Sequence, residues 1–309
     1  MFKHKSGIQL ALMTAGISGI SIFVNKLAVG FIKPPVLYTG LKNVMAGMLI
    51  LAALVALKKL PQLVRLKSRH WLTLLTVGII GGYVPFYLFF TGLAGADVVA
   101  GAIIQKTLIF WVALMAMTFL KEKLSVLTLA GVLVLFYANA AVGGFKGFAY
   151  SVSELYILAA TLLWSVETII VKKALSDFDP MILAFGRMGI GSALLLLTAH
   201  FTSPAGLGAV ASLTVTQWSL TALTALTLFA YVTSWYGALA KAEAITVMAL
   251  LVPATLITNL LSAAFLTHTL SYPAIIQMAL MVLGVGLFLY GRKYAGYNDA
   301  KNRLVQKTN

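Results

Sequence analysis

The sequence predicts an all-α integral membrane protein in which ten transmembrane helices form two inverted five-helix repeats. Three observations predict this fold: the composition, a series of long apolar runs, and an internal repeat. Of the 309 residues, 61% are hydrophobic and only 10% are charged, whereas soluble domains carry about 25% charged residues. This composition is typical of a chain immersed in a lipid bilayer.

Ten apolar runs are long enough to cross a bilayer, whose core is about 30 Å thick and needs about 20 apolar residues per helix. The polar–apolar alternation of a membrane β-barrel is absent from the sequence, so helices remain as the way to pair backbone groups in lipid. The predicted helices cover residues 8–28, 36–57, 71–93, 98–120, 125–142, 154–173, 180–200, 217–239, 246–266 and 273–291. No connection is long enough to form a domain, so function is expected in the membrane part.

The distribution of basic residues predicts the orientation. Most of the 23 lysines and arginines fall in connections on the side of the N-terminus, and the positive-inside rule then places both termini in the cytoplasm. The exceptions are Lys26, Lys33 and Lys146 on the other side, and Lys42, Lys106 and Arg187 within spans. The net charge of +15 therefore indicates topology and contact with lipid headgroups, not nucleic acid.

An internal repeat relates the two halves of the chain. At an offset of about 146 residues, Phe119-Leu120 falls on Phe265-Leu266 and Lys26 falls on Lys172. With one residue of slippage, Lys42 falls on Arg187. A unit of five helices is odd in number, so the second copy must cross the membrane in the opposite sense, as in many secondary transporters.

Several segments resemble the EamA-like permeases of the drug/metabolite transporter superfamily. They are FLKEKLS (Phe119 to Ser125) at the end of the fourth helix, the fifth helix with Gly131, and LLWSVETIIVKKAL (Leu162 to Leu175) in the sixth helix. The second copy departs from the pattern, with His268 where the first has Glu122. The resemblance covers nearly the whole chain.

The resemblance implies a central cavity lined by helices one to four and six to nine, with peripheral fifth and tenth helices that often support dimers. It also implies a prokaryotic plasma (inner) membrane. The expected units are residues 1–150 and 151–295, one EamA-like repeat each, and a basic cytoplasmic tail over residues 296–309.

Lys106 lies about 12 Å from the outer end of the fourth helix, at 1.5 Å per residue. Burying such a charge costs about 2.5 to 3.5 kcal/mol, so a structural or functional role is expected for Lys106. In the second copy, Val252-Pro253 takes the place of Lys106-Thr107, and a proline inside a helix removes a hydrogen bond. Both repeats are therefore expected to interrupt the helix at this level, where Gln105 and Lys106 would line the cavity.

Glu167 and Arg187 lie at similar depth on either side of the turn between the sixth and seventh helices, which predicts an ion pair. Asp179 before Pro180 is expected to cap the seventh helix. Lys42 and Lys106 would then have no obvious acidic partner, and a cavity with surplus positive charge would favour an anionic group.

Two other interpretations of these lysines stay open. In the first, Lys42 reaches the outer headgroups and Lys106 binds backbone carbonyls freed by the helix breaks. In the second, burial disfavours the charged form of Lys106 enough for it to exchange a proton during the transport cycle. Glu167 also leaves open a site for cationic compounds.

Aromatic residues supply a second candidate lining. Tyr83 and Tyr87 flank Pro85 in the third helix, and Tyr231 and Trp235 share a face of the eighth. Trp164 lies one turn from Glu167, although membrane aromatics also form interfacial belts. The pair Gly81-Gly82 predicts a bend that could act as a gate. The candidate substrate-binding residues are Lys42, Tyr87, Gln105, Lys106, Trp164, Glu167, Arg187, Tyr231 and Trp235.

The sequence gives little support for an enzyme. The four histidines lie at helix ends or in connections without metal-ligand spacing, and the sequence has no phosphate-cradling glycine loop. We therefore expect no catalytic residues, cofactor or metal. The predicted function is secondary active transport of a small metabolite by alternating access, such as an amino acid or another carboxylate. The alternatives are an exporter of cationic or aromatic compounds and a non-transporting scaffold or accessory subunit, and a homodimer stays open.

Overall fold

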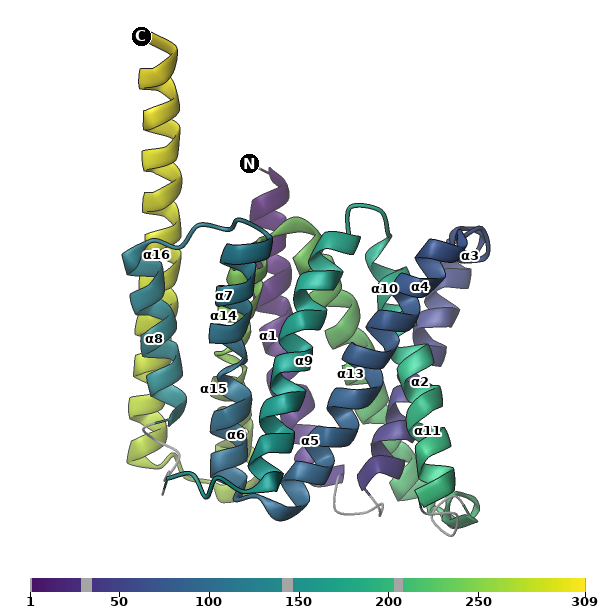
Figure 1. Ribbon diagram of the computed structural model, residues 1–309. Helices are drawn as coiled ribbons and strands as arrows, with labels where there is room; N and C mark the ends of the chain where they lie inside the picture. The colour runs from purple at the N-terminus through teal and green to yellow at the C-terminus, as the bar shows by residue number, and fades with distance from the viewer. Residues whose placement is uncertain (1, 29–34, 141–146, 203–207, 309) are drawn as a thin grey trace.

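A computed structural model describes residues 2–28, 35–140, 147–202 and 208–308, and every regular element in these ranges is helical (Figure 1). The first half contains α1 (Phe2–Ala28), α2 (Pro35–Ala56), α3 (Leu60–Val64), α4 (Ser68–Val77), the π-helix η1 (Gly78–Tyr83), α5 (Val84–Gly95), α6 (Val98–Lys106), α7 (Leu108–Phe119) and α8 (Val126–Ala140).

The second half repeats this order of spans. It contains α9 (Val152–Ala174), α10 (Pro180–Phe185), the π-helix η2 (Gly186–Ile190), α11 (Gly191–Thr202), the 3-10 helix η3 (Ala209–Ser212), α13 (Val215–Lys241), α14 (Ala244–Leu251), α15 (Ala254–Ser262), the π-helix η4 (Ala263–Thr267) and α16 (Tyr272–Thr308).

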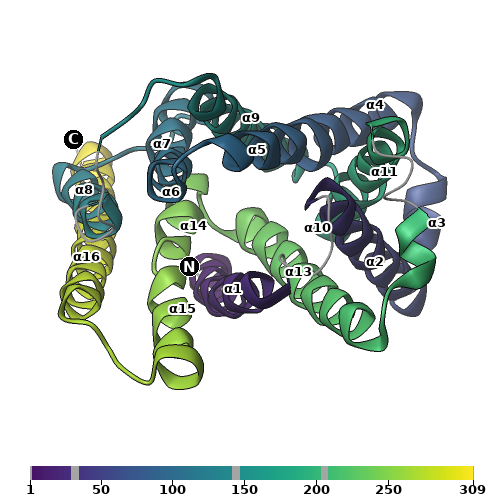
Figure 2. The ribbon, with the colours of Figure 1, turned by 90° about the horizontal axis from the view of Figure 1, so that it is seen from below.

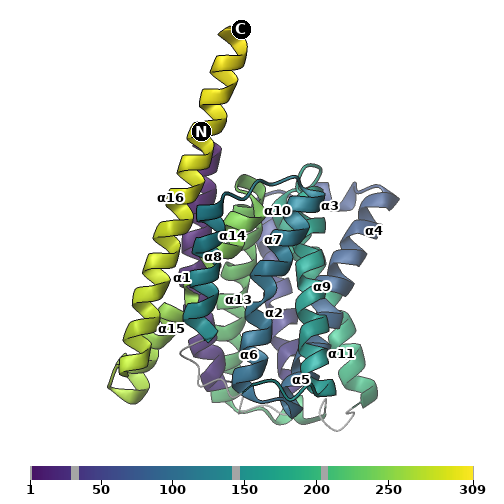
Figure 3. The same ribbon diagram turned by 60° about the vertical axis from the view of Figure 1, so that its left-hand side comes forward.

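The predicted transmembrane architecture is confirmed. Within the described ranges, nine helical segments are long and apolar enough to cross a membrane, and α8 is a shorter apolar helix at the tenth expected place. The last helix is longer than predicted, because α16 continues to Thr308 and projects beyond the bundle (Figure 3). Residues 296–308 of the expected tail are thus helical, while Lys33 and Lys146 lie outside the described residues.

The two repeats run in opposite senses. In Figure 1, α1 starts at the end of the bundle from which the C-terminus projects, whereas α9, the first helix of the second repeat, starts at the opposite end. Both termini lie at the same end, which we call the basic end because α3 and the connections rich in lysine and arginine also lie there. An inverted repeat is therefore present.

Packing between the repeats follows the same symmetry. The first helix of each repeat packs on the third span of the other, as α1 on α13 and α9 on α5. The fifth span of each repeat, α8 and α16, pair with each other at one edge of the bundle (Figure 2). This peripheral placement of the fifth and tenth helices agrees with the resemblance.

Both predicted helix interruptions are present. The fourth span breaks between α6 and α7 at Thr107, whose hydroxyl donates to Ile104 O at 2.6 Å and accepts from Trp111 Nε1 at 3.1 Å. The ninth span breaks between α14 and α15 at Val252 and Pro253. The two repeats thus interrupt the helix at equivalent positions, one at a threonine whose hydroxyl bonds a helix carbonyl and the other at a proline.

The predicted irregularity at Gly81-Gly82 is a π-helical turn, η1, and it packs on the second π-helical turn, η2. A Cβ atom at Gly82 would lie 2.1 Å from the backbone oxygen of Arg187, and one at Gly191 would lie 2.5 Å from Gly82 Cα. Only glycine allows this approach of the third and seventh spans. The close approach of η1 and η2 places Arg187 next to the sixth span.

Candidate functional site

Glu167 and Arg187 form the predicted ion pair. Arg187 Nη1 lies 3.3 Å from Glu167 Oε1 and 3.2 Å from Oε2, so one guanidinium nitrogen faces both carboxylate oxygens. Glu167 is 0% exposed and Arg187 is 7% exposed. Mutual neutralisation offsets the cost of burying both charges, and removal of either partner would leave the other uncompensated.

Tyr236 completes the coordination of this carboxylate. Its hydroxyl donates to Glu167 Oε1 at 2.6 Å, and such a short bond to an ionised acceptor is among the stronger hydrogen bonds in proteins. On the other side, a Cβ atom at Gly81 would lie 2.6 Å from Glu167 Cγ. The carboxylate is therefore enclosed by α9, α13 and η1.

Aromatic rings surround the guanidinium group. Arg187 Cζ lies 5.1 Å from the ring centre of Trp235 and 6.0 Å from that of Phe86, within the range of cation–π attraction. Tyr231 stacks on Trp235 with ring centres 6.2 Å apart, and Trp164 meets Phe86 edge-on at 5.4 Å. We call Trp164, Glu167, Arg187, Tyr231, Trp235 and Tyr236 the central cluster.

Two donors in the central cluster have no acceptor within the described part of the chain. Arg187 Nε and Trp235 Nε1 are buried and make no hydrogen bond to any described residue. Trp164, in contrast, donates its Nε1–H to Gly81 O at 3.1 Å. Buried donors are usually paired, since an unpaired one costs about 1–3 kcal/mol. The cluster could therefore accommodate an additional hydrogen-bond acceptor.

Lys42 forms a second buried site on α2. It is 7% exposed and donates from Nζ to Asn25 Oδ1 at 3.0 Å. The neighbouring polar side chains of α1 and α13 enclose Lys42, so its ammonium group points into the bundle in this structure.

The side chains of Lys106, Gln105 and Tyr87 form no hydrogen bond, ion pair or ring contact with the described residues of the central cluster. Lys106 and Gln105 are half-buried at the C-terminal end of α6, and neither side chain forms a hydrogen bond or ion pair with a described residue. The proposed bonding of Lys106 to freed carbonyls is therefore not observed in the described chain. Tyr87 on α5 is half-buried beside Phe86 in sequence.

Sequence reasoning left out several residues of these sites. Tyr236 of the central cluster, and Asn25, Tyr38 and Thr224 around Lys42, are not among the predicted substrate-binding residues. Adjacency to Trp235 was the available signal for Tyr236. The contact between Asn25 and Lys42 joins two helices, so no local pattern could have indicated it.

The basic end is held together by charged groups that cap helices. Glu122, after α7, accepts the backbone N–H groups of Ala244 at 2.7 Å and Ile245 at 3.1 Å, and so caps α14. Lys172 of α9 donates to the carbonyls of Leu239 at 2.6 Å and Ala242 at 2.7 Å at the end of α13. Charges of these signs are favourable at these helix ends. Both interactions join one helix of the bundle to another.

Burial along the ninth span matches this arrangement. Every residue from Ala244 to Leu250 in α14 is buried, whereas in α15 only Ala254 is. Arg292 of α16 adds an ion pair with Glu243 and a hydrogen bond of 3.0 Å to Lys123 O. The ninth span is thus tightly packed at the basic end and loosely packed toward the other.

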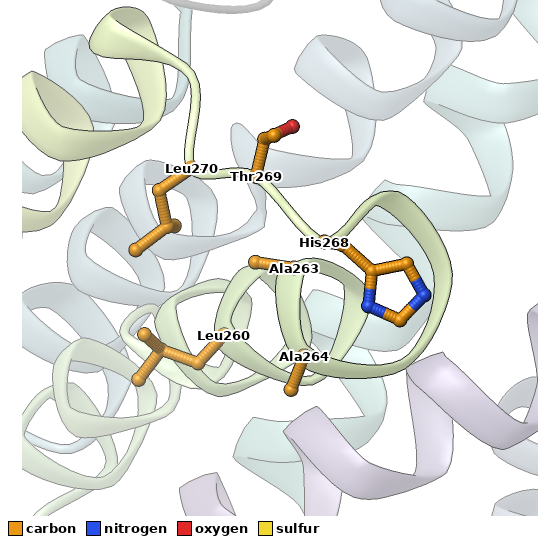
Figure 4. Close-up of a pocket in the computed structure, with 6 residues that line it drawn as sticks. All are labelled: Leu260, Ala263, Ala264, His268, Thr269 and Leu270. Atoms are coloured by element: carbon orange, nitrogen blue, oxygen red, sulfur yellow. The ribbon is translucent and has the colours of Figure 1, made fainter.

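An open hollow of about 330 Å³ (Figure 4) lies at the end of the ninth span, which Figure 1 shows to be far from the basic end. Its lining is Leu260, Ala263, Ala264, His268, Thr269 and Leu270. His268 takes the place of Glu122 in the second repeat, and here its side chain is exposed. None of the candidate substrate-binding residues lines this hollow. Among the described residues, no group of His, Asp and Glu side chains is arranged to hold a metal ion.

Comparison with known proteins identifies the family of this chain. The sequence model of the EamA-like transporter family matches residues 5–142 and 151–290. YvbV of Bacillus subtilis (strain 168), described as an uncharacterized transporter, is 24% identical over 297 residues, which cover 92% of both chains. A solved crystal structure superposes with a TM-score of 0.78 at 18% identity, covering 94% of this chain and 99% of the other.

Proposed function

Since the chain belongs to the EamA-like transporter family, and is therefore a multi-pass membrane transporter, we propose that it moves a small anionic metabolite by alternating access. The substrate class is a carboxylate, such as an amino acid or another organic acid. Transport is secondary, driven by a substrate gradient, by exchange or by protons.

The observation that carries this proposal is the imbalance of charge inside the bundle. Of the three cations that the sequence places within spans, Arg187 has an acidic partner, whereas Lys42 and Lys106 form no ion pair with a described residue. Cations within membrane spans are costly when they lack a counter-charge. An anionic substrate would supply the missing charge as it passes.

Alternating access is supported by the inverted repeats and by the unequal packing of the two ends. Such repeats can exchange conformations, with the substrate between them near mid-membrane. The capped, buried α14 corresponds to a conformation closed at the basic end. With the basic end in the cytoplasm of a prokaryotic plasma membrane, this conformation would receive substrate from outside.

Two other functions receive less support. A site for cations at Glu167 would require a carboxylate with free oxygens, but this carboxylate is fully buried and both oxygens accept from Arg187 or Tyr236. A scaffold would be expected to present its charged and aromatic residues to a partner, whereas Trp235 and Arg187 lie inside the bundle.

Ligand binding to the detergent-solubilised protein tests the proposal. A metabolite library would be screened by thermal shift against the wild type, Lys106→Ala and Lys121→Ala, the last a matched loss of an exposed lysine outside the spans. We expect carboxylates to stabilise the wild type and Lys121→Ala but not Lys106→Ala. Uptake by proteoliposomes would then verify transport of the hits.

The opposite pattern contradicts the proposal. If only cationic or neutral aromatic compounds stabilise the protein, and Lys106→Ala responds as the wild type does, the site does not recognise an anion. The central cluster with Glu167 would then be the site to examine.

A further inference from the structure

Lys42 is a buried cation whose polar contacts within the described residues are with neutral groups. Besides its bond to Asn25, its Nζ lies 5.4 Å from the ring centre of Tyr38. An ammonium group has three N–H donors, and no second acceptor for Lys42 is found in the described chain. Two donors and a full positive charge therefore remain without partners.

The neighbouring groups are fixed in place by their own hydrogen bonds. Asn25 donates from Nδ2 to Ser21 O at 2.7 Å, which turns Oδ1 toward Lys42. The Tyr38 hydroxyl lies 3.1 Å from Asn25 Oδ1 and donates to Thr224 Oγ1 at 3.0 Å. The first repeat and α13 thus build a preformed polar site around one cation. We call Lys42, Asn25, Tyr38 and Thr224 the Lys42 site.

The repeat shows which charge this site lacks. Lys42 corresponds to Arg187, and at the offset of 146 residues Ser21 corresponds to Glu167. In the second repeat the cation therefore has a carboxylate across the helical hairpin, 3.2 Å away. In the first repeat a hydroxyl stands at the position of that carboxylate.

We propose that a carboxylate group of the transported molecule binds to Lys42 and takes the place of the acid that the first repeat lacks. This inference rests on the proposed transport of an anion and assigns where its charge is held. The two unused N–H donors of Lys42 match the two oxygens of a carboxylate. A phosphate dianion would require a second cation at the site.

Two further observations agree with a ligand at this position. Ser21, Asn25 and Thr227 around the site are half-buried, so the site is not fully sealed. On the adjoining face of the same helix, one residue along from Tyr38 and from Lys42, Thr39 Oγ1 and both polar atoms of the Asn43 amide are buried without a partner among the described residues.

The test introduces the missing carboxylate as a side chain of the protein, by substitution. Asn25→Asp puts an acid at the 3.0 Å partner of Lys42, and Ser21→Glu puts one at the position equivalent to Glu167. Ser21→Gln is the matched neutral control. Acetate, succinate and inorganic phosphate, as sodium salts at equal ionic strength, would be titrated into each purified variant by thermal shift.

If the Lys42 site holds the carboxylate, acetate and succinate stabilise the wild type and Ser21→Gln. Asn25→Asp and Ser21→Glu then have higher melting temperatures than the wild type without anion, and their apparent affinity for both anions falls at least tenfold. Lys42→Gln, which removes the charge without adding an acid, loses the response as well and serves if the acidic variants do not fold.

Three results would overturn the inference. The first is an unchanged anion response in Asn25→Asp, Ser21→Glu and Lys42→Gln, and the second is stabilisation by phosphate alone. The third is loss of the stabilisation by carboxylates in Lys106→Ala together with its full retention in Lys42→Gln. This third result would leave the proposed transport of an anion intact. If no anion stabilises the wild type and no carboxylate is taken up by proteoliposomes, the proposed function itself fails.

Discussion

The hydroxyl of Tyr236 donates a hydrogen bond of 2.6 Å to Glu167 Oε1, and this contact fixes α13 to α9. The same carboxylate pairs with Arg187 in η2, so three spans of the second repeat meet at one buried group. Glu167 consequently holds Arg187 beneath the ring of Trp235 and is itself shielded. In this conformation Glu167 fixes the position of the Arg187 guanidinium group.

Replacement of Glu167 by glutamine should destabilise the protein strongly. The guanidinium group would stay buried without its counter-charge, and loss of one partner of a buried pair costs about 3–5 kcal/mol. Unfolding in detergent with increasing SDS would measure the loss. Tyr236→Phe keeps the ion pair and should cost only about 1–3 kcal/mol.

A double variant distinguishes ion pairing from packing at this site. Glu167→Gln combined with Arg187→Met removes both charges, so it should be more stable than Glu167→Gln alone. A double variant that loses the sum of both single effects would show that the two side chains act independently.

Gly82→Ala should disrupt the contact between the two π-helical turns. The added Cβ would approach the backbone oxygen of Arg187 at 2.1 Å, and backbone cannot rotate away as a side chain can. Overpacking of this kind costs about 1–3 kcal/mol. Thermal melting of Gly82→Ala would be compared with Gly286→Ala in α16, where a Cβ meets no atom within 4 Å. Equal melting temperatures for the two variants would contradict the tight contact.

Loss of the Glu122 carboxylate should loosen the basic end. Glu122→Ala leaves the N–H groups of Ala244 and Ile245 without their acceptor, and α14 should then separate from α7 more often. The chain contains no cysteine, so Met248→Cys, at a buried position of α14, gives a single reporter. We expect a several-fold faster reaction with a maleimide in the Glu122→Ala background.

The matched control for this experiment is Glu154→Ala. Glu154 also accepts a backbone N–H, that of Ala149 at 3.0 Å, but at the opposite end of the bundle. It should leave the labelling rate of the reporter unchanged. Equal rates in both backgrounds would mean that Glu122 does not keep the basic end closed.

Membrane orientation can be read from two further single cysteines at opposite ends of the bundle. Gln62 is exposed in α3 at the basic end, and Tyr150 is 86% exposed before α9. With the basic end in the cytoplasm, an impermeant maleimide should label Gln62→Cys only in inside-out vesicles and Tyr150→Cys only in right-side-out vesicles. The reversed pattern would place both termini outside.

Much of the site could be predicted because its chemistry is rare within apolar helices. Glu167 and Arg187 stand out in their spans, and their equal distance from the turn at Asp179 and Pro180 sufficed to pair them. Asp179 caps α10 as expected, accepting the N–H of Met181 at 2.9 Å. These inferences needed only helix geometry and the cost of charge in lipid.

The amino-acid sequence alone determined the fold class, the inverted repeat, the helix interruptions near Lys106 and Pro253, and the ion pair of the second repeat. These depend on hydrophobicity, on helical spacing and on neighbours across a short turn. Tertiary structure alone decided that Lys42 meets Asn25, that Tyr236 rather than Tyr231 bonds Glu167, and that Glu122 caps α14. The physical reason is that these contacts join helices distant in sequence, and their rotation and approach depend on packing at positions such as Gly82 and Gly191.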